Sequence, residues 1–301
     1  MRRRPTLRAA YGALLVTALL VAACLLAGCG GAAPPAKAGQ LTVLADTSFM
    51  ADIAQNVAGD RLSVSALIPT GADPHSFEPT PQDATRVAQS RAIIINNRGL
   101  EPMVDDLISG AGRSGLLVVE AAAGLAGARQ DPHLWLDPVE VVTYVDNIRR
   151  GLSAIDPAGS EVYAKNAQSY AQKLRDLDQW IAAQVQTIPA GRRLLVTNHE
   201  SFGYFAKRYG FTIVGAIFES VSGEGSPSAR ELAALIEQIK ASGAPAVFLE
   251  TGNNPDLAAQ IAKETGVKVV TDLYVHSLGA NANTYLDMMR WDVNLIVEAL
   301  R

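Results

Sequence analysis

The stretch AGSEVYAKNAQSYAQKLRDLDQWIAAQVQTI, residues 158–188, decides how the rest of the chain is organised. It contains no Pro and, after Gly159, no Gly, and it is flanked by Pro157 and Pro189. A helix of this length is about 45 Å long at ~1.5 Å per residue, so we expect a rigid helix that joins two folded lobes. Its apolar side chains recur every three or four residues, the period of one helix face: Tyr163, Ala167, Tyr170, Leu174, Leu177, Ile181, Val185 and Ile188.

Short apolar runs alternate with helical patterns on both sides of this helix. Such runs are typical of buried parallel strands, and their alternation with helices is typical of an α/β sheet. We therefore predict an α/β fold of two lobes with mainly parallel sheets flanked by helices. The N-terminal lobe is expected over residues 41–156, the linking helix over 157–189 and the C-terminal lobe over 190–301. The runs cover residues 41–45, 62–68, 92–96, 116–120, 194–197, 211–217, 246–250 and 267–271.

The first 28 residues have the composition of an export signal. Four Arg precede an uncharged run that ends in Leu-Ala-Gly-Cys at residues 26–29. This end resembles the bacterial lipoprotein signal, in which the Cys after such a triplet is lipidated. We predict a signal peptide over residues 1–28, lipid on Cys29 and a flexible tether over residues 29–40. Cys24 is the second candidate, and an uncleaved anchor is the alternative, since about 20 apolar residues can span a bilayer. Every version places the body outside the cytoplasm.

The charge and the cysteines exclude several classes of protein. Residues 1–28 hold four Arg and no acid, which leaves 22 basic side chains against 30 acidic ones. A nucleic-acid-binding surface is expected to be basic, so we predict no nucleic-acid partner. Both Cys belong to the signal region, so a chain that starts at Cys29 has no thiol pair for a disulfide or a zinc-thiolate site.

The four His of the chain are the candidates for chemistry, because each follows a predicted strand by a few residues. The carboxyl ends of parallel strands are where open α/β sheets bind ligands. Two of the His fall in each predicted lobe, so one cleft between the lobes would gather all four. The first two stand in the same tripeptide, Asp-Pro-His, whose Asp can orient nearby groups. The four are His75, His133, His199 and His276.

Four longer motifs carry a resemblance to a known family: GADPHSFEPTPQD at 71–83, DPHLWLDP at 131–138, NHESFGYFAKRYG at 198–210 and PSAREL at 227–232. From about Leu41 to residue 301 the chain resembles the zinc and manganese solute-binding lipoproteins of metal ABC transporters, the cluster A-I family. The resemblance implies two α/β lobes, a rigid linking helix and one metal ion in the cleft. It places His75, His133 and His199 at the first three ligand positions.

The fourth ligand position departs from the family pattern. The family usually has an Asp in the segment that matches Leu273–Leu278, and this sequence has His276 there. We predict that His276 replaces the carboxylate, with Asp272 or Glu200 as alternative oxygen donors. Glu250, at the end of a predicted strand, is a candidate for contact with the ligands, and a solvated carboxylate is the alternative.

The ligand set also bears on the identity of the metal. Imidazole suits zinc, copper, iron and nickel, whereas manganese prefers carboxylate and water oxygens. A manganese-selective branch of the family often has Glu at the third position, where this chain has His199. We therefore predict Zn2+ as the ion, with Mn2+ as the alternative.

These observations predict a metal-binding protein rather than an enzyme. We expect an extracytoplasmic monomer, anchored by lipid, that captures a divalent transition-metal ion and delivers it to the membrane permease of an ABC importer. A zinc hydrolase with Glu200 as base is one alternative, but four protein ligands would close the coordination position that catalytic zinc keeps open. A surface adhesin on the same fold is the other.

Overall fold

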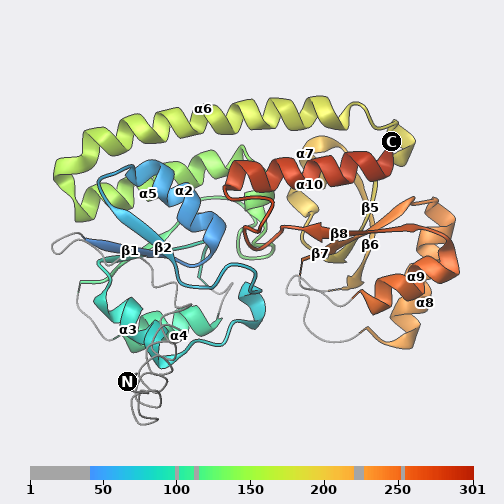
Figure 1. Ribbon diagram of the computed structural model, residues 1–301, viewed down its shortest axis with the longest axis horizontal. Helices are drawn as coiled ribbons and strands as arrows, with labels where there is room; N and C mark the ends of the chain where they lie inside the picture. The colour runs from blue at the N-terminus through green and yellow to red at the C-terminus, as the bar shows by residue number, and fades with distance from the viewer. Residues whose placement is uncertain (1–40, 99–101, 112–114, 220–226, 252–254) are drawn as a thin grey trace, which may run out of the picture. The chain divides into compact units, whose positions relative to one another are not determined.

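A computed structural model describes residues 41–98, 102–111, 115–219, 227–251 and 255–301, and these residues belong to one compact unit (Figure 1). The predicted signal peptide, Cys24, Cys29 and the tether lie outside the described residues. Within the described part of the chain, no helix combines the length and the apolar character needed to cross a membrane.

The first half of the chain forms a four-stranded parallel sheet in the order β2-β1-β3-β4. Its strands are β1 (Thr42–Ala45), β2 (Ser63–Ala66), β3 (Ala92–Ile95) and β4 (Leu117–Glu120). The helices that join and follow them are α2 (Ser48–Ala58), α3 (Pro81–Gln89), α4 (Pro102–Gly110) and α5 (Glu140–Ile155). Figure 1 shows α2 and α5 on one face of this sheet and α3 and α4 on the other.

The central strand β3 explains why this sheet is covered on both faces. All four of its residues are apolar and buried, and successive side chains of a strand point to opposite faces. Ile93 and Ile95 therefore pack with Val87 of α3 and Val104 of α4. Ala92 and Ile94 belong to the cluster that contains the buried side chains of α2 and α5.

The long helix is present as α6 (Ser160–Val185), and the eight apolar positions predicted for its stripe are all buried. It is shorter than the predicted span because Pro157 belongs to a separate short turn, η3 (Pro157–Gly159), and the helix ends before Pro189. Figure 1 shows α6 lying along α5 and α10 (Tyr285–Leu300), and it packs against both of them and against α2.

The second half of the chain contains two pairs of parallel strands. β5 (Leu194–His199) pairs with β6 (Thr212–Phe218), and β7 (Ala246–Glu250) pairs with β8 (Lys268–Leu273). The helices of this half are α7 (Gly203–Tyr209), α8 (Ala229–Ser242), α9 (Asp256–Thr265) and α10. The α/β class with parallel sheets and one long helix is thus confirmed, and the lobe boundaries stay a prediction.

Helix α10 connects the second half of the chain to the first. Its first residue, Tyr285, donates its backbone N–H to Asp52 Oδ2 of α2 at 2.9 Å. Leu300, at the other end of the helix, is fully buried in the apolar cluster that also contains Val43 of β1. One continuous core therefore includes side chains from both halves.

Candidate metal centre

The four His lie where the strands of both halves end. His199 is the last residue of β5, and His276 follows β8 by three residues. His75 lies in the short turn η1 (Pro74–Ser76) after β2, and His133 immediately precedes the turn η2 (Leu134–Leu136) after β4. This is the placement expected from the sequence.

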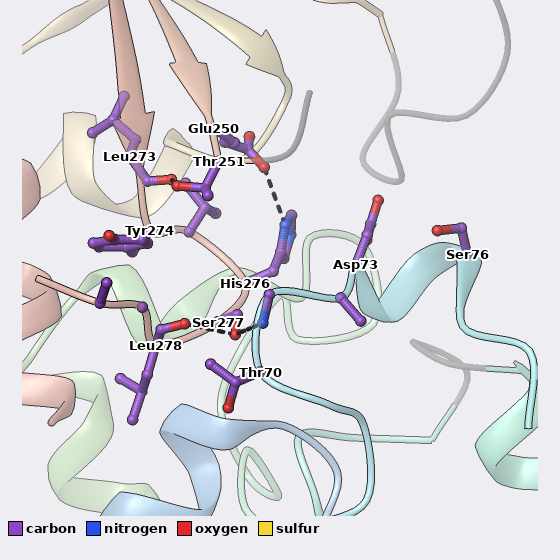
Figure 2. Close-up of a pocket in the computed structure, with 15 residues that line it drawn as sticks. Thr70, Asp73, Ser76, Glu250, Thr251, Leu273, Tyr274, His276, Ser277 and Leu278 are labelled. Atoms are coloured by element: carbon purple, nitrogen blue, oxygen red, sulfur yellow. Dashed lines mark hydrogen bonds and ion pairs between the residues drawn. The ribbon is translucent and has the colours of Figure 1, made fainter. Parts of the chain in front are cut away.

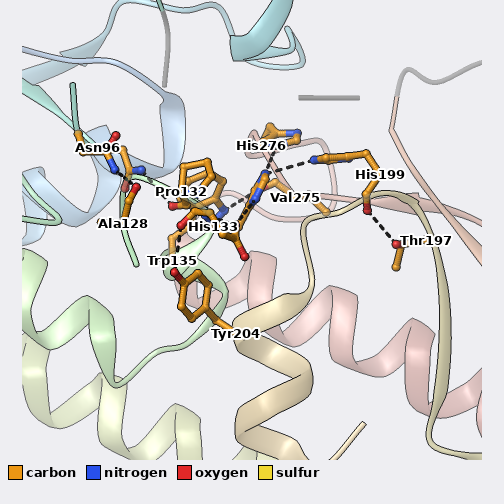
Figure 3. A network of polar contacts seen from close by, with 12 residues as sticks. Asn96, Ala128, Pro132, His133, Trp135, Thr197, His199, Tyr204, Val275 and His276 are labelled. Carbon is orange, nitrogen blue, oxygen red and sulfur yellow. Dashed lines mark hydrogen bonds and ion pairs between the residues drawn. The ribbon is translucent and has the colours of Figure 1, made fainter. Parts of the chain in front are cut away.

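The imidazoles form one cluster, in which one ring nitrogen of each His lies within 4.8 Å of those of the others. His133 Nε2 is 3.2 Å from His276 Nε2 and 3.2 Å from His199 Nε2 (Figure 3). A tetrahedral zinc with bonds of about 2.05 Å holds its nitrogen ligands ~3.3 Å apart. Two edges of the cluster already have the spacing of a tetrahedral nitrogen site.

The cluster is shielded from water. The exposed fractions are 0% for His133, 2% for His199 and 8% for His276, and His75 is half-buried. Among the described residues, Nε2 of His75 is nevertheless a buried nitrogen without a hydrogen-bond partner. Buried polar atoms normally have a hydrogen-bond partner. The unpaired Nε2 of His75 is therefore available to bind a ligand that is not part of the chain.

Carboxylates lie behind three of the rings. Asp131 Oδ1 accepts the backbone N–H of His133 at 3.0 Å and lies 2.8 Å from its Nδ1. Glu250 Oε1 is 2.6 Å from Nδ1 of His199, and its Oε2 is 3.1 Å from Nδ1 of His276. A carboxylate at Nδ1 favours the tautomer with its proton on that atom, which leaves the Nε2 lone pair free for a metal. Glu250 therefore contacts two of the rings, as one of its predicted roles required.

The electrostatics favour neutral rings at His75 and His133 and an ionised carboxylate at Glu250. Burial, and then the neighbouring His276 and His199, lower the pKa of His75 to about 3. The same kind of environment holds the pKa of His133 well below its usual range. Burial by itself would raise the pKa of Glu250, but His276 and His199 lower it to about 2. Because a metal binds the deprotonated ligand, protons compete weakly for His75 and His133 at neutral pH.

The pKa of Asp131 shifts in the opposite direction to that of Glu250, because fewer neighbouring groups offset the effect of burial. Burial raises the pKa of Asp131 to about 6, against the N–H of His133, which lowers it. In the parallel tripeptide, Asp73 Oδ1 accepts only the backbone N–H of His75, at 2.9 Å. The two Asp-Pro-His motifs thus use their Asp in different ways.

Among the described residues, the alternative oxygen donors Glu200 and Asp272 are not part of the group of side chains that converge at the cluster. Glu200 directly follows His199 but is exposed, because the chain bends there after the end of β5, with the N–H of Ser201 donating to the carbonyl of His199 at 2.9 Å. Asp272 is also exposed and has a left-handed φ of 71°, and its Oδ2 accepts the hydroxyl of Thr271 at 2.9 Å.

Two aromatic side chains that the sequence did not identify as functional hold the ligand segments together. Trp135 Nε1 donates to the carbonyl of Val275 at 2.8 Å, so the indole connects the segments of His133 and His276. The hydroxyl of Tyr204, on α7, donates to the carbonyl of Asp131 at 3.1 Å (Figure 3). Trp135 is buried, and a buried indole N–H needs a hydrogen-bond partner, which the carbonyl of Val275 supplies here.

A cavity of about 580 Å³ lies beside the cluster, with His276 and Glu250 in its wall (Figure 2). Its other walls are formed by the segment that carries His75, from Thr70 to Ser76, and by residues 273–280. Parts of two of the segments that supply imidazoles therefore line this cavity.

The chain is similar to known proteins along most of its length. The family model described as ZnuA, zinc-uptake complex component A, periplasmic, matches residues 43–299. The manganese-binding lipoprotein MntA of Halalkalibacterium halodurans is 33% identical over 267 residues, covering 86% of this chain and 88% of that protein. The iron-binding protein YfeA of Yersinia pestis is 32% identical over 275 residues and 88% of each chain. The structure of the periplasmic zinc-binding protein TroA from Treponema pallidum matches with a TM-score of 0.80 and 27% identity, over 87% of this chain and 99% of that one.

Proposed function

Because the chain belongs to the ZnuA family of metal-binding components of ABC transporters, we propose that it captures one zinc ion at the four-histidine cluster and delivers it to an importer. The family consists of substrate-binding proteins and not of enzymes, so the hydrolase alternative falls away. The chain is a metal-binding, extracytoplasmic component of an ABC transporter. The identity of the ion as zinc is the part that we propose.

The observation that carries the choice of zinc is the donor set. Relatives are named for manganese, iron and zinc, so the family alone does not select the ion. In this chain the four converging donors are imidazole nitrogens, and the buried carboxylate of Glu250 lies behind His199 and His276, at their Nδ1 atoms. Zinc accepts a tetrahedral nitrogen shell, and manganese prefers oxygen ligands.

In this proposal His75, His133, His199 and His276 bind the ion, and Glu250 and Asp131 orient three of the rings and offset the charge of the ion. The partner is a membrane permease that receives the ion from a monomer. Support for the partner comes from the relatives, which are named as lipoproteins of metal ABC transporters.

Metal analysis tests this function directly. We expect metal-free protein incubated with zinc and then desalted to retain one zinc ion per chain, and the His133→Ala/His199→Ala double variant to retain none. Glu200→Ala is the matched control, because Glu200 is adjacent to His199 but exposed. Equal zinc content in the double variant would refute the site. Undiminished zinc uptake by cells that lack the gene would favour the adhesin alternative.

The proposed lipid anchor has its own test. If Cys29 carries the lipid, membrane-extracted protein should begin at Cys29 and have the additional mass of a diacylglycerol group. The Cys29→Ser variant should then move from the membrane fraction to the soluble fraction, because it lacks the thiol that the lipid modifies. Mass spectrometry and fractionation measure both results, and a lipidated start at Cys24 or an intact N-terminus would contradict the assignment.

A further inference from the structure

Two serines that are 229 residues apart join the segments that carry His75 and His276. Ser48 is the first residue of α2, and Ser277 follows His276 directly. We propose that the pair, here named the serine clasp, positions these two ligands and thereby sets the rate at which the metal leaves. This inference rests on the proposed function.

The contacts of the clasp connect three segments. Ser277 Oγ accepts the backbone N–H of Gly71 at 2.7 Å and lies 3.1 Å from Ser48 Oγ. Ser48 Oγ accepts the backbone N–H of Leu278 at 2.9 Å, and Ser277 Oγ donates to the carbonyl of Leu278 at 2.9 Å. The clasp thus joins α2, the segment before His75 and the segment after His276.

The hydroxyl groups satisfy all of these contacts at once. Each hydroxyl has one hydrogen and two acceptor sites. Ser277 uses its hydrogen on the carbonyl of Leu278, so Ser48 donates to Ser277, which also accepts from Gly71. Gly71 has φ of 88°, a conformation that other residues rarely adopt. Removal of either hydroxyl therefore leaves a backbone N–H without its acceptor.

The clasp contacts Gly71, four residues before His75, and Ser277 directly follows His276; Gly71 and Ser277 both line the cavity described above. Figure 2 shows Ser277 next to His276 and Leu278, and the Ser277 hydroxyl accepts the Gly71 N–H and donates to the Leu278 carbonyl. The His75 and His276 rings are 4.9 Å apart between centroids and nearly perpendicular. His75 is the most exposed of the four rings, so its segment is the one expected to separate first.

A metal ion and the clasp would hold the same two segments together. A contact that already fixes the separation of two ligands lowers the ordering cost when both bind one ion. Loss of that contact is expected to act mostly on dissociation, because association rates vary little among variants of one site. The effect of one lost hydrogen bond is about fivefold.

The test is the rate of zinc release into an excess of chelator, measured by stopped flow on the full folded protein. We expect Ser48→Ala and Ser277→Ala each to release zinc at least about fivefold faster than the unmodified chain. The double variant should be hardly faster than the singles, since both remove one connected unit. Ser277→Thr keeps the hydroxyl and should restore slow release. Ser76→Ala, an exposed serine that lines the same cavity, is the matched control and should have no effect.

The absorption spectrum of bound Co2+ separates this role from general damage to the site. The donor set is unchanged in the Ala variants, so their Co2+ spectra should match that of the unmodified chain. An unmodified chain that binds neither zinc nor Co2+ would refute the proposed function. Normal binding together with unchanged release rates in both Ala variants, or release by Ser277→Thr as fast as by Ser277→Ala, would refute the clasp alone.

Discussion

In a buffered competition titration, the protein is expected to bind zinc at least about a hundredfold more tightly than manganese, a difference of ~2.7 kcal/mol. The physical reason is that four imidazole nitrogens converge, while the carboxylates of Glu250 and Asp131 are engaged at Nδ1 atoms on the outer side of the rings. Manganese would therefore have to exchange its preferred oxygen ligands for nitrogen. Copper is omitted from the competition, because it binds such sites tightly whatever the physiological cargo.

The variant His276→Asp is the matched comparison for this titration. It restores the carboxylate that the family usually has at the fourth position and leaves the other three rings in place. We expect it to reduce the preference for zinc by at least about tenfold, or ~1.4 kcal/mol. Equal or tighter binding of manganese by the unmodified chain would overturn the zinc assignment and leave the family membership intact.

Glu250→Gln is expected to weaken zinc binding by about 10- to 100-fold, the range found when groups that orient metal ligands are changed. The carboxylate of Glu250 contacts Nδ1 of both His199 and His276. A Gln side chain has one acceptor oxygen, and its amide group donates, so it suits a proton on only one of the two Nδ1 atoms. The other ring would change tautomer and direct an N–H at the metal.

Isothermal titration with zinc measures this loss of zinc affinity. At neutral pH the unmodified Glu250 is ionised, because His276 and His199 lower its pKa to about 2. Asp272→Asn is the control, since Asp272 is an exposed acid next to the end of β8, and it should change the affinity by less than about twofold. A larger effect of Asp272→Asn than of Glu250→Gln would show that an oxygen ligand completes the site.

The features of the fold that depend on the local spacing of apolar residues could be predicted from the sequence. The stripe of α6 and the buried strand β3 follow from apolar spacing, and each of the four His follows the end of a strand. The carboxyl ends of parallel strands are where open α/β sheets bind ligands, so His residues that follow strands could be expected to gather at one site.

What the sequence could not predict depends on contacts between distant segments. No local sequence pattern distinguishes Ser48 and Ser277 from other serines. The role of Trp135 in connecting two ligand segments becomes visible only in the structure, where its indole N–H donates to the carbonyl of Val275. The position of Glu200 depends on the bend that follows β5, and that of Asp272 on a left-handed backbone angle within β8. Such details change by a single residue of register, which pattern alone does not fix.

The position of α10 has a consequence for the order in which the protein folds. Leu300 is buried in the same cluster as Val43, and Tyr285 is bound to Asp52. During synthesis the strands of the first sheet are made long before α10. The apolar side chains of α2 and α5 that pack in the same cluster as α10 therefore lack this partner until α10 has been made. Domains generally fold from the N-terminal side as the chain is made. In this protein the first half lacks part of its apolar packing until α10 has been made.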